Sequence, residues 1–180
     1  MWISGVETPL IHKFEAGYAA GVEHVDEDIT VEVDYLSQPP DFSGFSDPAK
    51  GRETAQAQYD RGADVIYHAA GASGNGVLES AVANDFTFIG VDSDQYENAA
   101  EDQKPHVLTS AIKQVDVAVF ELISAATEGE VEGGIQRFEL ADGGVDYTTS
   151  NEEAISPIQE QLDEIKQQII DGEIEVPTQP

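Results

Sequence analysis

The sequence DVIYHAAGASGNGVLESAVANDFTFIGVD occupies residues 64–92 and carries the strongest structural signal in the chain. Residues 64–68 and 86–91 are short apolar runs of the kind that form buried strands. Between them, the glycine-rich segment from Gly71 to Gly76 predicts a turn, and residues 75–83 predict a helix. A strand, a helix and a second strand joined by short connections are typical of a parallel, helix-covered sheet.

The same alternation extends from this unit toward the amino terminus. Thr8 and Pro9 predict the start of a helix, because threonine suits the N-cap and proline suits the first helical position. The alternating residues 29–36 predict a strand. With a strand over residues 2–4 and a helix over residues 48–61, the order becomes β-α-β-α-β-α-β. This order predicts an α/β fold with a parallel sheet and helices on both faces.

The carboxyl-terminal part continues with less regular elements. We expect a strand over residues 107–110 and a helix over residues 114–128. Two further strands, residues 135–140 and 145–148, are expected to form a hairpin around the turn Asp142-Gly143-Gly144.

A final helix is predicted from capping and periodicity. Ser156-Pro157-Ile158-Gln159 has the pattern of a capping box with proline at the first helical position. Gly172 is expected to end the helix. Its buried stripe is predicted to consist of Ile155, Ile158, Leu162, Ile165 and Ile169.

The charge of the chain limits its partners. Its 180 residues include 36 acidic and 8 basic side chains, which give a formal charge of −28. Phosphates and anionic lipids would be repelled over most of this surface, which argues against nucleic acid and anionic membranes as partners. The acidic residues are dispersed and lysine is scarce, a composition that indicates adaptation to high salt, as in a halophile.

The residue types present give no support to an enzyme or a metal site. The chain has no cysteine, and its four histidines lack the spacings of zinc sites. Neither a Ser-His-Asp order nor a nucleophile elbow is found. We therefore expect no catalytic residue, no metal and no cofactor.

Three features follow predicted strands, where ligands bind in open α/β sheets. Phe42 and Phe45 lie in the loop after the second strand, Gly71 begins the glycine-rich turn, and Asp92 and Asp94 follow the fourth strand. Together they would place an aromatic face, backbone amides and carboxylates around one cleft.

Each feature also has a plainer interpretation. A loop phenylalanine either stacks on a ligand or packs as a plug, and a glycine-rich turn either cradles a phosphate or only joins a strand to a helix. The order G-x-x-G-x-G, without a P-loop lysine, is not that of a nucleotide site. A carboxylate at a strand end either caps a helix or accepts hydrogen bonds from a vicinal diol, and it repels phosphate. Lys113 is one of five lysines and would serve equally as a solvated counter-charge.

Five segments between residues 2 and 176 match one known family in chain order. They are PLIHKFEAGY (9–18), FSDPAKG (45–51), AAGASGNGV (69–77), GVDSDQ (90–95) and VLTSAIK (107–113). Through them the sequence resembles the basic membrane protein family, the purine-nucleoside-receptor-like lipoproteins of ABC importers. The second and fourth segments are the most specific.

The resemblance implies a type I periplasmic-binding fold, in which two α/β lobes close on a ligand at a hinge. It implies that Phe45 stacks on the base and that Gly71, Asp92 and Lys113 bind the ribose hydroxyls. The implied function is capture of a purine nucleoside, without catalysis, for the permease subunits of an ABC importer. The implied location is extracytoplasmic, as a cell-surface lipoprotein.

The sequence departs from the family at its amino terminus. Family members begin with a lipoprotein signal, a lipid-bearing cysteine and most of a first lobe, none of which we recognise in these residues. We therefore expect a truncated form of the fold. Residues 1–106 would form the second lobe, residues 107–134 a return segment that packs in the first lobe, and residues 135–180 a carboxyl-terminal part that packs on the second lobe.

Other functions are compatible with the same fold. A related protein would bind a different sugar-like solute, and a regulatory or interaction protein would keep the fold without transport. A sugar-processing enzyme is a third alternative. A neighbouring permease gene would favour transport, whereas measured turnover of a nucleoside would favour the enzyme.

The dispersed charge leads to a prediction about stability. Raising monovalent salt from millimolar to molar concentration is expected to raise the thermal midpoint of unfolding, because salt screens the repulsion among the carboxylates. Calorimetry across a sodium chloride series measures this effect. A midpoint that is flat or falls would contradict the interpretation as salt adaptation.

Overall fold

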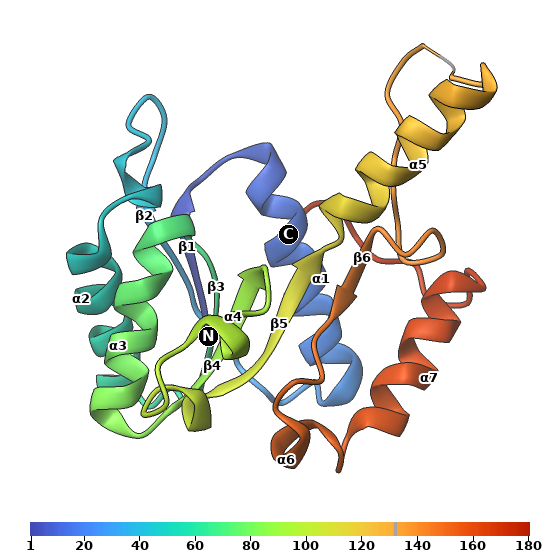
Figure 1. Cartoon of the computed structure of the whole chain (residues 1–180). Coiled ribbons are helices and arrows are strands. Elements are labelled where there is room, and N and C mark those ends of the chain that lie inside the picture. Colours follow the sequence, from blue (N-terminus) through green and yellow to red (C-terminus); the bar gives the residue numbers. More distant parts are fainter. Residues whose placement is uncertain (132) are drawn as a thin grey trace.

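The central strands bury side chains on both of their faces. Trp2 and Ile3 are neighbours in β1 (Trp2–Val6), and both are 0% exposed. They belong to two different apolar clusters, because neighbours in a strand point to opposite faces of a sheet. Such a sheet needs helices on both sides, and this computed structural model, which describes residues 1–131 and 133–180, has that arrangement (Figure 1).

The described residues form one six-stranded sheet with the order β2-β1-β3-β4-β5-β6. The pairs from β2 to β5 are parallel, and only β6 runs antiparallel to its neighbour β5. This confirms the predicted α/β fold with a mainly parallel sheet. The remaining strands are β2 (Val33–Ser37), β3 (Val65–Ala69), β4 (Thr87–Asp92), β5 (Val107–Lys113) and β6 (Val145–Tyr147).

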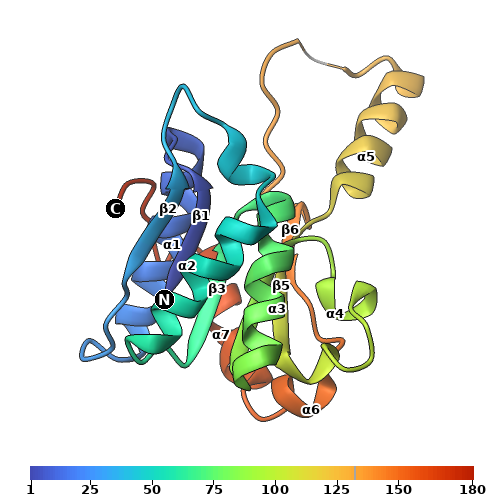
Figure 2. The ribbon, with the colours of Figure 1, turned by 90° about the vertical axis from the view of Figure 1, so that its left-hand side faces the viewer.

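Helices cover both faces of the sheet. One face carries α2 and α3, and the other carries α1 with α7 beside it (Figures 1 and 2). None of the helices in the described residues is long and apolar enough to cross a membrane. The helices are α1 (Pro9–Val25), α2 (Pro48–Asp60), α3 (Gly74–Asn84), α4 (Gln95–Asn98), α5 (Val115–Glu128), α6 (Glu152–Ile155) and α7 (Gln159–Ile170).

The predicted start of α1 is confirmed. Thr8 is its N-cap, the Thr8 hydroxyl accepts a hydrogen bond from the Ile11 N–H at 3.4 Å, and Pro9 is the first helical residue. Because α1 follows β1 directly, its amino-terminal end lies at the carboxyl edge of the sheet. This edge is where the candidate site was expected.

The predicted strand over residues 29–36 is partly wrong. β2 begins only at Val33, because Trp2, the first residue of β1, pairs with Val33. β2 is an edge strand, so residues 29–32 have no other strand beside them with which to pair. Alternation alone predicted the strand too long, since pairing also needs a partner.

The predicted hairpin between residues 135–140 and 145–148 is wrong. Residues 135–139 form no strand, and β6 pairs instead with β5, with Val145 opposite Lys113. The turn at residues 140–143 is present, but it leads into the sheet edge rather than back along a hairpin. β6 pairs with the free edge of β5, which is a regular strand, whereas residues 135–139 form no strand with which it could pair.

The predicted capping box is also wrong. The Asn151 side chain caps the short helix α6 by accepting a hydrogen bond from the Ala154 N–H, and residues 156–158 then form a turn. α7 therefore begins at Gln159, with Ile158 as an N-cap that makes no side-chain hydrogen bond. In the predicted stripe only Ile155 is fully buried and Ile158 is 40% exposed, whereas Leu162, Ile165 and Ile169 are half-buried. Gly172 ends the helix as expected, with a φ of +74°.

Helix α5 projects away from the sheet (Figures 1 and 2). None of residues 115–128, all of which the structure describes, is buried. Val115, Phe120 and Ile123 are 62%, 68% and 59% exposed, respectively. A contiguous apolar surface of this kind marks a contact that the remaining described residues do not provide.

We expect this surface to make the chain self-associate in solution. The association should strengthen as salt rises, because screening removes the repulsion between acidic chains. Phe120→Glu combined with Ile123→Glu should abolish it, as measured by analytical ultracentrifugation at several salt concentrations. The matched control is Val25→Glu, which charges a residue of similar exposure (60%) on α1. Equal loss of association in the control would refute a role for α5.

Candidate functional site

The candidate site lies along one edge of the sheet. Strands β3, β4 and β5 are parallel, so their carboxyl ends meet at the same edge. Asp92 is the last residue of β4, Lys113 is the last residue of β5, and Gly71 follows two residues after β3. Phe45 comes from the loop after β2, where Ser43–Phe45 forms a short 3-10 turn.

Phe45 and Gly71 form the first contacting pair. Gly71 has a φ of +55°, and a Cβ at this position would stand 2.9 Å from the carbonyl oxygen of Phe45. Both observations explain why glycine occupies the position. The Phe45 ring lies against Gly5 at the end of β1 and is half-buried on the cluster around Trp2. The ring thus packs on the sheet edge, and the residue keeps part of its surface accessible to solvent.

Asp92 and Lys113 form the second pair. The Lys113 ammonium lies 2.6 Å from the Asp92 carboxylate, and it also lies 4.9 Å from the centroid of the Phe14 ring. The side chain of Lys113 is 44% exposed, and that of Asp92 is 55% exposed. Ion pairs of this exposure contribute little to stability. The ion pair can therefore open at small cost in free energy, and each side chain can then bind a ligand in place of the other.

The backbone at Asp92 is strained. Its φ is +67°, and the Ser93 N–H donates to the Val91 carbonyl at 2.8 Å. A three-residue turn with a positive φ at its centre is the rarer and more strained form of the γ-turn. Strain of this kind persists where the surrounding structure enforces it, and it concentrates at binding sites.

The charge of Asp92 also acts on a buried tyrosine. Burial first, and then the negative charge of Asp92, raises the pKa of the Tyr67 hydroxyl. The hydroxyl therefore stays protonated at neutral pH. The Tyr67 ring itself belongs to the buried apolar cluster around Trp2.

Sequence reasoning did not identify Phe14 as part of the site. Phe14 packs against the apolar cluster around Trp2, as a residue of the sheet-facing side of α1 does. Phe14 also faces the ammonium of Lys113, because α1 begins at the carboxyl edge of the sheet. The position of Phe14 within the first two turns of a helix after a strand was the available signal.

The four predicted residues are thus brought to one edge as two contacting pairs. The carboxylate accepts hydrogen bonds from hydroxyl groups, the ammonium donates to them, and a half-open ring offers an aromatic surface. Within the described residues, no group of three or more histidine or acidic side chains is placed to hold a metal ion. The edge thus carries a hydrogen-bond acceptor, a hydrogen-bond donor and an aromatic side chain.

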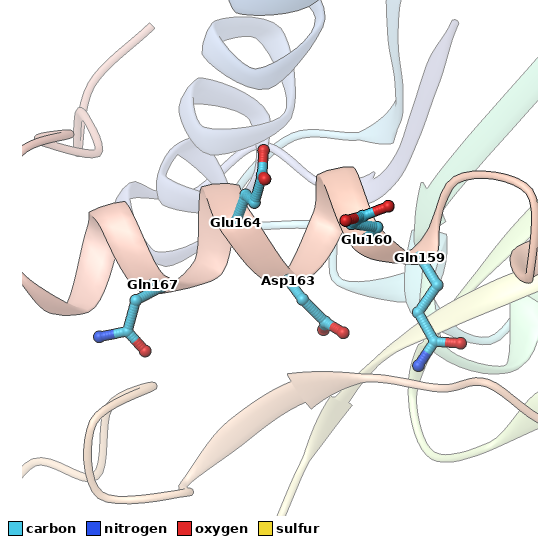
Figure 3. Close-up of a pocket in the computed structure, with 5 residues that line it drawn as sticks. All are labelled: Gln159, Glu160, Asp163, Glu164 and Gln167. Carbon is cyan, nitrogen blue, oxygen red and sulfur yellow. The ribbon is translucent and has the colours of Figure 1, made fainter.

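A separate hollow lies along α7 and differs in character (Figure 3). Gln159, Asp163 and Gln167 point from the helix toward the neighbouring strand, whereas Glu160 and Glu164 point away from it (Figure 3). All five lining residues come from this one helix, and none of the four predicted site residues is among them. The hollow offers no aromatic or basic side chain.

Comparison with known proteins gives the relatives of the chain. It is 34% identical over 192 residues to the CD4+ T-cell-stimulating antigen of Listeria monocytogenes, covering 99% of this chain and 52% of that protein. It is 36% identical over 191 residues to the ABC transporter nucleoside-binding protein BmpA of Lactococcus lactis, covering 98% of this chain and 52% of that protein. The chain therefore spans about half the length of these curated relatives.

A solved structure shares the fold. An ABC transporter solute-binding protein from Conexibacter woesei superposes with a TM-score of 0.76 at 20% identity, over 98% of this chain and 56% of that one. The fold of the chain is therefore the α/β periplasmic-binding-like fold. The chain belongs to the family of PnrA-like ABC transporter substrate-binding proteins, whose model matches residues 1–180. This confirms the resemblance to the basic membrane protein family, and none of these relatives is described as an enzyme.

The contact between Gly71 and Phe45 gives a test of the site geometry. Gly71→Ala is expected to destabilise the chain by about 2–4 kcal/mol, because it combines a left-handed residue with a Cβ too close to a carbonyl oxygen. Gly172→Ala is the matched control, since Gly172 has a similar φ of +74° but nothing within 4 Å of an added Cβ. The control should lose only about 1–2 kcal/mol. Equal losses in urea unfolding would show that the approach of Phe45 is not tight.

Proposed function

We propose that this chain supplies one face of a binding site for a purine nucleoside. Asp92 and Lys113 bind the ribose hydroxyls, the backbone at Gly71 approaches the same sugar, and Phe45 stacks on the base. The observation that carries the proposal is the strained turn that presents the Asp92 carboxylate beside Lys113 at the carboxyl edge. The printed name of the Lactococcus lactis relative, a nucleoside-binding protein, supports the choice of ligand.

Electrostatics favour a nucleoside over a nucleotide. Asp92 lies at the centre of the proposed site, and the whole chain carries a formal charge of −28. Both would repel a phosphate group, whereas the hydroxyls of a neutral ribose need acceptors and donors of the kind present. The site therefore suits an uncharged, hydroxylated ligand.

The chain is proposed to act with a second lobe. Residues 1–106 and 135–180 would form the lobe that carries Asp92, and α5, within the segment 107–134, would pack on the other lobe. β5, the first part of that segment, lies within the sheet, so the proposal concerns the part beyond it. The exposed apolar surface of α5 supports this division. One lobe contacts one side of a ligand, so the chain alone should bind weakly.

The proposed cellular role follows from the family. We propose that the protein delivers its solute to the permease subunits of an ABC importer from an extracytoplasmic position, as a lipoprotein. The description of the family as substrate-binding proteins of ABC transporters supports this role. No step of the proposed role requires a cofactor or catalysis.

A second candidate ligand is a sugar-like solute without a base. The packing of the Phe45 ring against Gly5 favours it, because a ring that fills the sheet edge can serve as a plug without stacking on a ligand. The carboxylate and ammonium would bind such a solute in the same way.

The proposal predicts a large effect at Asp92. Asp92→Ala should weaken inosine binding by about 2–4 kcal/mol, because it removes charge-assisted hydrogen bonds to the ribose hydroxyls. Chemical-shift titration by NMR measures this even when the chain binds weakly. Asp60→Ala, which changes an exposed carboxylate at the end of α2, is the control and should bind as the unmodified chain does. Unchanged affinity in Asp92→Ala would remove Asp92 from the site.

The same titration separates the two candidate ligands. A stacked base makes Phe45→Ala weaken inosine binding by about 1–3 kcal/mol, whereas Phe45→Trp preserves it. Ribose alone should be insensitive to both changes. If Phe45→Trp and Phe45→Ala bind inosine equally, the ring is a packing plug and the sugar-like ligand is favoured.

A further inference from the structure

A side-chain amide joins β3 to β4 where their backbone pairing stops. The ladder between these strands ends with Tyr67 opposite Ile89. Beyond that point the Gln95 Oε1 atom accepts a hydrogen bond from the Val91 N–H at 2.8 Å, and it lies 2.8 Å from Nε2 of His68. The side chain of Gln95 thus replaces a rung of the sheet, with β4 on one side and β3 on the other.

Two glycines make room for this arrangement. A Cβ at Gly74 would overlap the His68 ring, and a Cβ at Gly90 would stand 2.6 Å from Gln95 Oε1. Contacts this short do not occur between real side chains, so any larger residue would displace the ring or the amide. Glycine at these two positions therefore leaves room for the side chains of His68 and Gln95.

The histidine ring is fixed as a hydrogen-bond donor to Gln95. His68 is 1% exposed and packs on Phe88, with ring centroids 4.9 Å apart. Its Nδ1 atom accepts a hydrogen bond from the Ala70 N–H at 3.3 Å, so the ring proton resides on Nε2 and points to Gln95. Burial lowers the pKa of His68 to about 4, while the contact with Gln95 and the charge of Asp92 oppose that shift. The ring is therefore neutral at physiological pH.

The backbone of Gln95 is anchored to β5, the strand that flanks β4 on the side opposite to β3. Its N–H donates to the Ser110 hydroxyl on β5 at 3.1 Å. The Ser110 N–H in turn donates to the Thr148 hydroxyl at 2.9 Å, just beyond β6. Gln95 is therefore held from β5, while its side chain reaches across β4 to β3.

The residue held by Gln95 is the first residue of the strained turn. The Val91 N–H binds Gln95, and the Val91 carbonyl accepts from the Ser93 N–H. Asp92 stands between them with its φ of +67°. A turn with this φ needs support from its surroundings, and the Gln95 amide is a side-chain group that binds the turn through its backbone.

We propose that Gln95, oriented by His68, is a positioning residue that holds Asp92 in its ligand-binding conformation. Gln95 acts through the backbone of Val91 and does not itself touch the ligand. This inference rests on the proposed function, in which Asp92 binds the ligand hydroxyls. The pair explains why a polar side chain is buried in the core next to the site.

The test compares Gln95→Leu with a matched control. Gln56→Leu removes another half-buried amide, one that joins α2 to α3 through Asn84 and lies outside the candidate site. In Gln95→Leu we expect inosine binding, followed by NMR titration, to weaken about tenfold, the effect of losing one hydrogen bond of ordinary strength at the turn. Gln56→Leu should be destabilised in urea unfolding to a similar extent, yet it should bind inosine as the unmodified chain does.

A readout without ligand makes the test independent of affinity. In Gln95→Leu the Val91 amide should lose its protection from hydrogen exchange, and the Cα and Cβ chemical shifts of Asp92 should leave their left-handed values. In Gln56→Leu both should stay unchanged. If Gln95→Leu preserves the protection and these shifts, Gln95 does not hold the turn and the inference is overturned.

The conservative variant Gln95→Glu tests the contact with His68. A carboxylate keeps the acceptor for the Val91 N–H, so the turn and inosine binding should be largely retained. It should raise the midpoint of the His68 titration by about 1–3 pH units, because a negative charge favours the protonated ring. Asp92 is the other charged group that acts on His68, and it is unchanged in this variant. An unaltered His68 midpoint would show that the two side chains are not in contact.

Failure of the inference and failure of the proposed function give different results. If Asp92→Ala weakens inosine binding but Gln95→Leu does not, Gln95 has no positioning role and the proposed site stands. If Asp92→Ala binds as the unmodified chain does, the proposed site fails. In that case, loss of Val91 protection in Gln95→Leu would still show that Gln95 holds the turn, but not that the turn serves ligand binding.

Discussion

The structure depends on the burial of both faces of its central strands. Trp2 and Ile3 in β1, like Ile66 and Tyr67 in β3, point to opposite sides and are all removed from water. Helices must therefore cover both faces, and parallel strands with helical crossovers satisfy that need. All strands of such a sheet end at one edge, so loops distant in sequence meet there. The candidate site is a consequence of this constraint, because its residues lie at the ends of four different strands or just after them.

Stability and binding place different demands on that edge. The Asp92–Lys113 pair is exposed and contributes little to the fold, and the turn at Asp92 is strained. Buried groups immediately behind it supply the rigidity: His68 and Ser110 are nearly inaccessible to solvent, and both bind Gln95. In our proposal a hydrogen-bonded network in the core thus holds the acceptor for a ligand, while the carboxylate itself stays exposed at the surface.

The errors of sequence reasoning share one physical origin. The alternation over residues 29–32, the irregular segment 135–139 and the apparent capping box at Ser156 are all local patterns that lack a tertiary partner. A strand needs a neighbour in register, and a helix start needs the chain direction that preceding contacts impose. Where local pattern and packing agreed, as in the β3–α3–β4 unit, the element boundaries differed by only a residue or two.

Local patterning was sufficient for the α/β class, for the order of the main elements and for the edge at which Phe45, Gly71 and Asp92 would lie. These features depend on which side chains avoid water and on where glycine and proline interrupt the chain, and both are written along the sequence. The place of Lys113 in the site came only from the resemblance to the family. Only the folded molecule showed that these residues form two contacting pairs, that Phe14 faces Lys113, and that Gln95 bridges β3 and β4. Such contacts join residues up to about a hundred positions apart, and their distances are fixed by the packing of the whole sheet.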